Sequence, residues 1–186
     1  MKNSLLIALF LCATSLSAQS DGPGQVVKAN PFGFIVGQYQ FGYERALNEK
    51  FSVQMSAGLL VGEGSATDSL TMETSTAKRS GFIVIPEFRF YPSGNVCEGF
   101  YIAAIARYRT ATMSLNGDDL YTKNVMGGAA VLGYQLSLDA MMIDVFLGPQ
   151  FKNVDTEWFN ESFSEEEPLF GGGNGIRFGA NIGFGW

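Results

Sequence analysis

The sequence predicts an all-β fold, an eight-stranded antiparallel up-and-down transmembrane β-barrel. Three observations predict it: short segments of alternating hydrophobicity, connections that alternate in length, and a last strand that ends on an aromatic residue. The alternation is clearest at residues 175–186, where every second residue is apolar and the residues between them are glycine, arginine or asparagine. Because side chains alternate faces along a strand, this segment has one apolar face for lipid and one thin polar face for a crowded lumen.

The N-terminus predicts export. Lys2 precedes an apolar run at residues 5–12, and Leu16-Ser17-Ala18 forms a small-residue cleavage site. The apolar run is far shorter than the ~20 residues that a membrane-spanning helix needs. We therefore expect a cleaved signal peptide at residues 1–18 and a single barrel domain at residues 19–186.

Eight alternating segments follow in order. They lie at residues 26–34, 40–47, 51–61, 81–91, 100–112, 125–136, 142–152 and 175–186. In each segment the apolar parity is rich in aromatic and aliphatic residues, as strands prefer. The opposite parity is small, polar or charged. Pro31, Pro86 and Pro149 fall within these segments, and since proline removes a ladder donor, we expect a bulge or a strand end at each.

The connections alternate in length, as they do in outer-membrane barrels with short periplasmic turns and longer outer loops. Short connections are expected at residues 48–50, 92–99 and 137–141. Long polar ones are expected at residues 62–80 and 153–174, and an intermediate one around residues 116–119. The first connection, at residues 35–39, is an exception because it is short where an outer loop is expected.

Aromatic residues cluster near the expected strand ends, where interfacial girdles are found. The periplasmic rim would hold Phe51, Phe90, Phe100, Tyr134 and Trp186. The outer rim would hold Phe82, Tyr108, Phe151 and Phe178.

The inward parity places charged residues in the lumen. They are Lys28, Glu44, Glu87, Arg89, Arg107, Arg109, Asp144, Lys152 and Arg177. An eight-stranded barrel is only just wide enough for its own side chains, and an isolated buried ion is very costly. We therefore expect a salt-bridge network, with trapped water, formed by Glu44, Glu87, Arg89, Arg107, Arg109, Asp144 and Arg177. Two interpretations remain open: the ions fill and rigidify the lumen, or they line a narrow path that prefers anions.

Composition argues against several other functions. There is no histidine, so Ser-His-Asp and Cys-His catalysis and histidine metal sites have no basis. The net charge of −6 argues against nucleic-acid binding. The acidic groups Asp118-Asp119 and residues 165–167 lack calcium-site spacing, so we expect solvated loop charges, no metal and no cofactor. Cys97 is the only cysteine after residue 18. It has two interpretations: an idle residue, that is, a turn residue without a chemical role, or a thiol that forms an intermolecular disulfide.

Three stretches have a recognisable pattern. They are Val-Lys-Ala-Asn-Pro at residues 27–31, Phe-Gly-Tyr-Glu-Arg-Ala-Leu-Asn-Glu-Lys-Phe-Ser at residues 41–52, and Pro-Glu-Phe-Arg-Phe-Tyr-Pro at residues 86–92. They resemble a family of small outer-membrane proteins from Bacteroidota-type bacteria. The architecture resembles the OmpA/OmpX-type barrel. Ile182, Phe184 and Trp186 resemble the C-terminal aromatic signal read by the barrel assembly machinery. The family has no established biochemical function, so the resemblance implies a location and no activity.

These observations together predict a monomeric, non-enzymatic integral protein of the outer membrane. Its expected partners are membrane lipid and the barrel assembly machinery, and its outer loops would contact surface partners. Two alternatives are a narrow pore or hydrophobic-solute conduit, and a soluble lipocalin-like exported binder. A lipocalin-like binder would have a polar exterior and an apolar interior.

Overall fold

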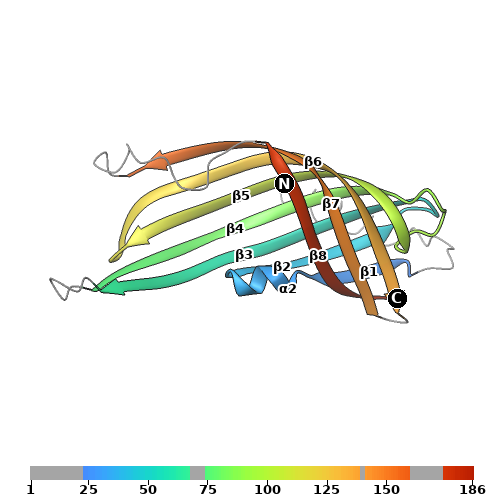
Figure 1. Cartoon of the computed structure of the whole chain (residues 1–186), viewed down its shortest axis with the longest axis horizontal. Coiled ribbons are helices and arrows are strands. Elements are labelled where there is room, and N and C mark those ends of the chain that lie inside the picture. Colours follow the sequence, from blue (N-terminus) through green and yellow to red (C-terminus); the bar gives the residue numbers. More distant parts are fainter. Residues whose placement is uncertain (1–22, 68–73, 139–140, 160–173) are drawn as a thin grey trace, which may run out of the picture.

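The computed structural model describes residues 23–67, 74–138, 141–159 and 174–186, in which eight antiparallel strands close into a barrel (Figure 1). The strands are β1 (Gln25–Ala29), β2 (Gln38–Ala46), β3 (Phe51–Thr67), β4 (Thr74–Phe90), β5 (Gly99–Leu115), β6 (Asp118–Leu138), β7 (Met141–Trp158) and β8 (Gly175–Gly185). Each strand pairs with the next, and β8 pairs with β1, which confirms the predicted fold class. The predicted signal peptide, residues 1–18, lies outside the described residues.

Apolar side chains cover the outside of the barrel. The outward parity of every strand carries an exposed large apolar residue, for example Val27, Phe41, Met55, Phe88, Ile102, Leu132, Leu147 and Phe184 in chain order from β1 to β8. The inward parity is buried or half-buried and holds most of the charged residues. This exterior is the opposite of the polar one that the lipocalin-like alternative requires.

A short helix, α2 (Pro31–Ile35), replaces the second half of the first predicted strand. Asn30 caps it: its side-chain oxygen accepts a hydrogen bond from the Gly33 N–H at 2.9 Å, and Pro31 occupies the first helical position. Proline suits that position because its fixed φ is helical and its missing N–H would have no partner there. The predicted strand at residues 26–34 is therefore wrong beyond Ala29. The helix packs between β2 and β8 (Figure 1). No helix among the described residues is long and apolar enough to cross a membrane.

The seam that closes the barrel is short. The ladder of β1 with β8 joins only Val26–Ala29 to residues 182–185. Beyond it, the backbones of Gln25 and Trp186 exchange two hydrogen bonds, at 3.1 and 3.0 Å. Closure satisfies backbone groups that would otherwise form an open edge.

Pro86 and Pro149 produce neither of the predicted features, because their strands run on without a bulge or an end. Pairing of β4 with β5 lapses between Val84 and Glu87 and then resumes in the same register. Pairing of β6 with β7 lapses around Pro149 in the same way. Each proline still has a register partner on its other side, Met55 for Pro86 and Ile176 for Pro149. A missing N–H affects only one of a strand's two ladders, so the other ladder keeps the strand straight.

The strands also extend further outward than predicted. Residues 62–67 pair with residues 74–79, and residues 153–158 pair with residues 121–126, so both predicted long loops were too long. Continuing an established hairpin adds ladder bonds at little extra loop entropy, which explains why polar residues that look loop-like form strand. The predicted intermediate loop contracts to a turn at Asn116-Gly117, where both residues have positive φ, 54° and 101°. Asn-Gly is the preferred sequence for such a two-residue turn.

Two pairs of the predicted rim aromatics contact each other across strands. Phe82 and Tyr108 have ring centroids 5.9 Å apart, and Phe51 and Phe90 have centroids 5.1 Å apart. Phe82 and Tyr108 are exposed on the outer wall, whereas Phe51 and Phe90 are half-buried beside the β2–β3 turn.

Gly117→Ala should lower the free energy of unfolding by about 1–2 kcal/mol, because a Cβ at this positive φ is strained even though the space around it is empty. Gly64→Ala is the matched control, since Gly64 also has open space around it but no positive φ. It should leave the denaturant midpoint in detergent unchanged or slightly higher. Equal losses in both variants would contradict the assigned turn.

Candidate functional site

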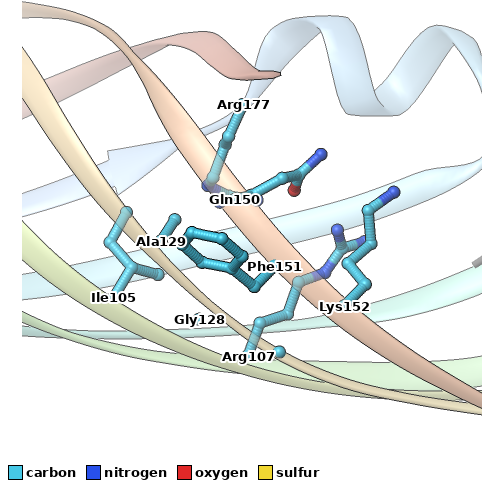
Figure 2. A pocket seen from close by; sticks show the side chains of 9 residues that line it. Ile105, Arg107, Gly128, Ala129, Gln150, Phe151, Lys152 and Arg177 are labelled. Atoms are coloured by element: carbon cyan, nitrogen blue, oxygen red, sulfur yellow. The ribbon is translucent and has the colours of Figure 1, made fainter. Parts of the chain in front are cut away.

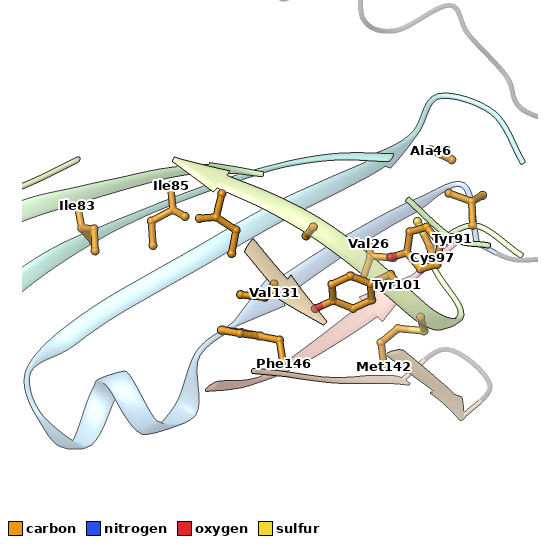
Figure 3. Close-up of a cluster of buried hydrophobic side chains, with 13 residues drawn as sticks. Val26, Ala46, Ile83, Ile85, Tyr91, Cys97, Tyr101, Val131, Met142 and Phe146 are labelled. Carbon is orange, nitrogen blue, oxygen red and sulfur yellow. The ribbon is translucent and has the colours of Figure 1, made fainter. Parts of the chain in front are cut away.

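The lumen is divided into three layers along the barrel. The inner cluster, at the end with the short turns, consists of Lys28, Glu44, Glu87, Arg89 and Asp144. The apolar layer follows, with Ile83, Ile85, Ile105, Val131 and Phe146, most of them labelled in Figure 3. The basic compartment lies toward the outer end, with Arg107, Arg109, Lys152 and Arg177. The order can be followed along single strands: in β5 the inward residues run from Tyr101 through Ile105 to Arg107.

Glu44 is the centre of the inner cluster. Its carboxylate accepts a hydrogen bond from the Lys28 ammonium at 2.5 Å and contacts the Arg89 guanidinium at 3.3 Å. The hydroxyls of Ser52 and Tyr91 donate to its other oxygen at 2.5 and 2.7 Å. Glu44 is completely buried, so these donors replace the water that it loses on folding.

Asp144 forms the second bridge between the same two cations. It lies 2.9 Å from the Lys28 ammonium and 3.1 Å from the Arg89 guanidinium. The Tyr101 hydroxyl donates to its other oxygen at 2.6 Å. Glu87 completes the set by accepting two bonds from Arg89, at 2.7 and 3.1 Å. The Arg89 guanidinium also lies 4.4 Å from the centre of the Tyr101 ring.

The inner cluster fills the lumen at that end. Three carboxylates face two cations, and the hydroxyl and amide donors supply the remaining hydrogen bonds. Gln135 connects the cluster to the β4–β5 turn, because its carbonyl accepts from Lys28 at 2.7 Å while its amide donates to the Cys97 carbonyl at 2.7 Å. The chemical consequence is a rigid, internally satisfied plug in which every carboxylate is already engaged.

The structure brings together Glu44, Glu87, Arg89 and Asp144 from the predicted network. It adds Lys28. The alternation of side chains predicted that Lys28 faces the lumen, but the predicted network did not include it. It does not bring in Arg107, Arg109 or Arg177, which form no ion pair with any described residue. The apolar layer lies between these arginines and the acids, so the prediction of one continuous network was wrong.

Sequence reasoning missed the residues that shape the lumen. Tyr91 and Tyr101 are completely buried and hydrogen-bonded to the inner cluster. Tyr101 lies opposite Gly133, where a Cβ would strike its ring, and Phe146 lies opposite both Gly133 and Gly179. Tyr101 and Arg107 are an even number of positions apart on the same strand, so the alternation would have shown that Tyr101 also faces inward. The pairing of large residues with glycines could not be seen without the strand register.

Cys97 is a buried structural residue. It lies in the β4–β5 turn at φ 63° with its side chain fully buried. Burial, reinforced by the nearby Glu44 carboxylate, raises the pKa of the Cys97 thiol well above its ordinary value. The thiol therefore stays protonated and covered, which supports the idle-residue interpretation over an intermolecular disulfide.

The predicted assembly signal lies on the outer wall. Ile182, Phe184 and Trp186 share the outward parity of β8 and its end, and all three are exposed. No group of three histidine, cysteine or acidic residues among the described residues is arranged to hold a metal ion.

The chain was compared with known proteins. No family model and no curated protein matches it, so the resemblance to the Bacteroidota-type family stays a prediction. Two crystal structures from Acinetobacter baumannii are similar to it. CarO2 has 11% identity and a TM-score of 0.48, covering 89% of this chain and 98% of its own. CarO has 14% identity and a TM-score of 0.44, covering 88% and 98%. At these values the likeness carries no functional argument.

Glu44→Ala should destabilise the barrel by about 3–5 kcal/mol, because it leaves two buried cations with one fewer carboxylate between them. Glu87→Ala should cost less, since only Arg89 loses a partner and keeps Glu44 and Asp144. Glu63→Ala is the control: its pair with Lys78 is exposed and 3.8 Å long, so no change is expected. Denaturant midpoints in detergent measure all three, and an unchanged midpoint for Glu44→Ala would refute the role of the cluster.

The Cys97 thiol should resist a maleimide reagent in the folded barrel and react fully once the barrel is denatured. Mass spectrometry of the labelled protein gives the modified fraction. Rapid labelling of the folded protein would show that the turn opens.

Proposed function

We propose that this protein is a non-enzymatic integral barrel of the bacterial outer membrane. The observation that carries the proposal is the closed barrel with exposed apolar side chains on the outward face of all eight strands. Closure pairs most of the wall's backbone with neighbouring strands, which is the condition for crossing lipid with strands. Where the β1–β8 ladder ends, helix α2 packs between β2 and β8. The predicted signal peptide supports export to the outer membrane, and barrel closure supports a monomer.

The proposed role is structural or surface-interacting, through the outer ends of β3 to β7. These strands continue past α2 and β8 (Figure 1). Beyond the apolar belt their side chains turn polar, with exposed Glu63, Lys78, Asp119, Asp155 and Glu157. Such a polar extension is suited to contacts outside the lipid, and its partner would be a surface component.

Filling of the lumen favours this role over transport. The inner cluster occupies the lumen with completely buried side chains that satisfy one another, and the apolar layer follows directly. A conducting path would need water along this length. Purified protein in planar bilayers should therefore show no stable conductance, and regular single-channel steps would favour the pore alternative.

The decisive experiment for the membrane assignment is a gel of outer-membrane fractions with and without boiling. We expect the unboiled protein to migrate differently from the boiled one, as closed membrane barrels do. Absence of a shift, with the protein in the soluble periplasmic fraction, would overturn the proposal.

Trp186 should be required for assembly through its side chain. Deleting Trp186 removes both the indole and two backbone bonds to Gln25, whereas Trp186→Ala removes only the indole. If the aromatic residue is the assembly signal, both variants should be depleted from the outer membrane and Trp186→Phe should not. Normal levels of Trp186→Ala would assign the effect to the backbone seam instead.

A further inference from the structure

Beyond α2 and β8 the wall continues as a sheet of five strands (Figure 1). The ladder of β2 with β3 ends at Gln38 and Leu60, and the ladder of β7 with β8 ends at Gln150 and Gly175. In the described part of the chain, five segments therefore pair only among β3 to β7: residues 62–67, 74–79, 110–115, 118–124 and 153–158. We call this part of the wall the outer sheet.

The two faces of the outer sheet differ in chemistry. Its outer face, which continues the apolar outside of the barrel, carries the exposed acids Glu63, Asp155 and Glu157. Its inner face, which continues the lumen wall, carries two rows of residues in register. From β4 to β7 the first row is Arg79, Met113, Tyr121 and Trp158, and the second is Gly81, Ala111, Lys123 and Thr156. Neither row contains an acid, so the inner face is cationic where the outer face is acidic.

The larger side chains of these rows form an elongated surface. We define the outer platform as six half-buried residues: Arg79, Met113, Tyr121, Lys123, Thr156 and Trp158. Adjacent strands lie about 4.8 Å apart, so the three steps from β4 to β7 give the platform a length of about 14 Å. Tyr121 and Trp158 form its aromatic end, with ring centroids 4.9 Å apart and ring planes tilted by 53°. Arg79 forms its cationic end.

Arg79 is held in place by a neutral group. Its guanidinium donates a hydrogen bond to the Val36 carbonyl at 2.7 Å, and it forms no ion pair with a described residue. A guanidinium has five N–H donors, so this one bond leaves donors for an acidic ligand. The neighbouring cation, Lys78, lies on the outer face and pairs with Glu63 at 3.8 Å.

The lumen beneath the platform is too narrow to admit a ligand. Two rows further along the same strands, Arg107, Lys152 and Arg177 line a recess (Figure 2). Its volume is about 10 Å³, which is room for about one water. A ligand of the platform therefore stays on the inner face of the outer sheet.

We propose that the outer platform binds a saccharide chain that carries carboxylates. A sugar ring packs its C–H face on Tyr121 and Trp158, since these rings offer a large apolar surface. A carboxylate further along the chain is bound by the Arg79 guanidinium, and the Lys123 ammonium adds a point charge. The acids of the outer face repel such a chain, so the charges of the two faces direct it to the inner one.

The backbone favours a saccharide over a peptide. A peptide commonly binds a sheet by adding a strand to its edge through main-chain hydrogen bonds. In β5 and β6 both sides of the outer sheet's backbone already lie in ladders, so only side chains contact a ligand there. This inference names a partner class for the surface-interacting role, and it rests on that proposed function.

The test titrates the full mature chain, refolded in a detergent without a sugar head group, with an oligogalacturonate by calorimetry. The methyl ester of the same oligosaccharide is the matched ligand, because it keeps the sugar rings and loses the charges. The acid should bind at least about 10-fold more tightly than its ester, as expected for one charge-assisted hydrogen bond. Equal binding of acid and ester, or of an oligoglutamate peptide of the same charge, would overturn the proposal.

Neighbouring residues supply matched control variants. Arg79→Gln should weaken oligogalacturonate binding roughly 10- to 100-fold. Lys78→Gln removes the same charge from the outer face and should bind like the wild type. Trp158→Ala should weaken binding about 10-fold through the lost ring contact. Phe159→Ala removes an exposed ring at the next position and should bind like the wild type. Equal losses within either pair would contradict the assigned face.

Folding is measured separately, because Arg79 also ties Val36 to β4. The denaturant midpoint of every variant is compared with that of the wild type. If Arg79→Gln is less stable, Lys123→Gln carries the test of charge, and unchanged binding by that variant overturns the role of the cations.

Failure of this inference can be told apart from failure of the membrane assignment. A protein that shifts on the unboiled gel but does not bind the oligogalacturonate overturns the platform alone. A protein that binds the oligogalacturonate but shows no shift and stays in the soluble fraction supports the platform and overturns the membrane assignment.

Discussion

The narrow lumen is the constraint on which the rest of this structure depends. Eight strands enclose a space that only the barrel's own side chains can fill, so large inward residues must alternate with small ones around each level. Tyr101, Gly133, Phe146 and Gly179 form such a row across four neighbouring strands. Gly133 and Gly179 thus serve packing: they provide the volume that the rings of Tyr101 and Phe146 occupy.

The same narrowness determines the electrostatics. With little room for water, each inward charge needs a partner or an exit to solvent. The inner cluster meets this requirement internally, since Glu44 and Asp144 each bridge Lys28 and Arg89. The apolar layer then isolates the basic compartment from those acids. Charge separation along one lumen gives the two ends different chemistry: one end is closed and self-satisfied, and the other is cationic and open.

The wall shows a corresponding asymmetry. β3 to β7 are long, whereas β1 is short and its ladder with β8 ends at Ala29 and Ile182. Helix α2 follows at this point and packs beside β8, while the Arg79 guanidinium donates to the Val36 carbonyl at 2.7 Å and ties the connection to β4. The first connection, which is too short for an outer loop, is thus accommodated by a helix in the wall.

The sequence by itself determined the strand order, the closure of the barrel and the face of each charged residue. These follow from alternation, which is local, and from the order of short and long connections. Tertiary structure decided which charges meet, because Lys28 and Asp144 are 116 residues apart and their contact depends on register and closure. It also decided the helix after Asn30 and the outward extension of the hairpins. The alternation predicts that both Arg107 and Arg89 face the lumen, yet they lie at different levels of it. The level of a residue along the barrel axis depends on strand tilt and register, which are set by pairing around the whole barrel.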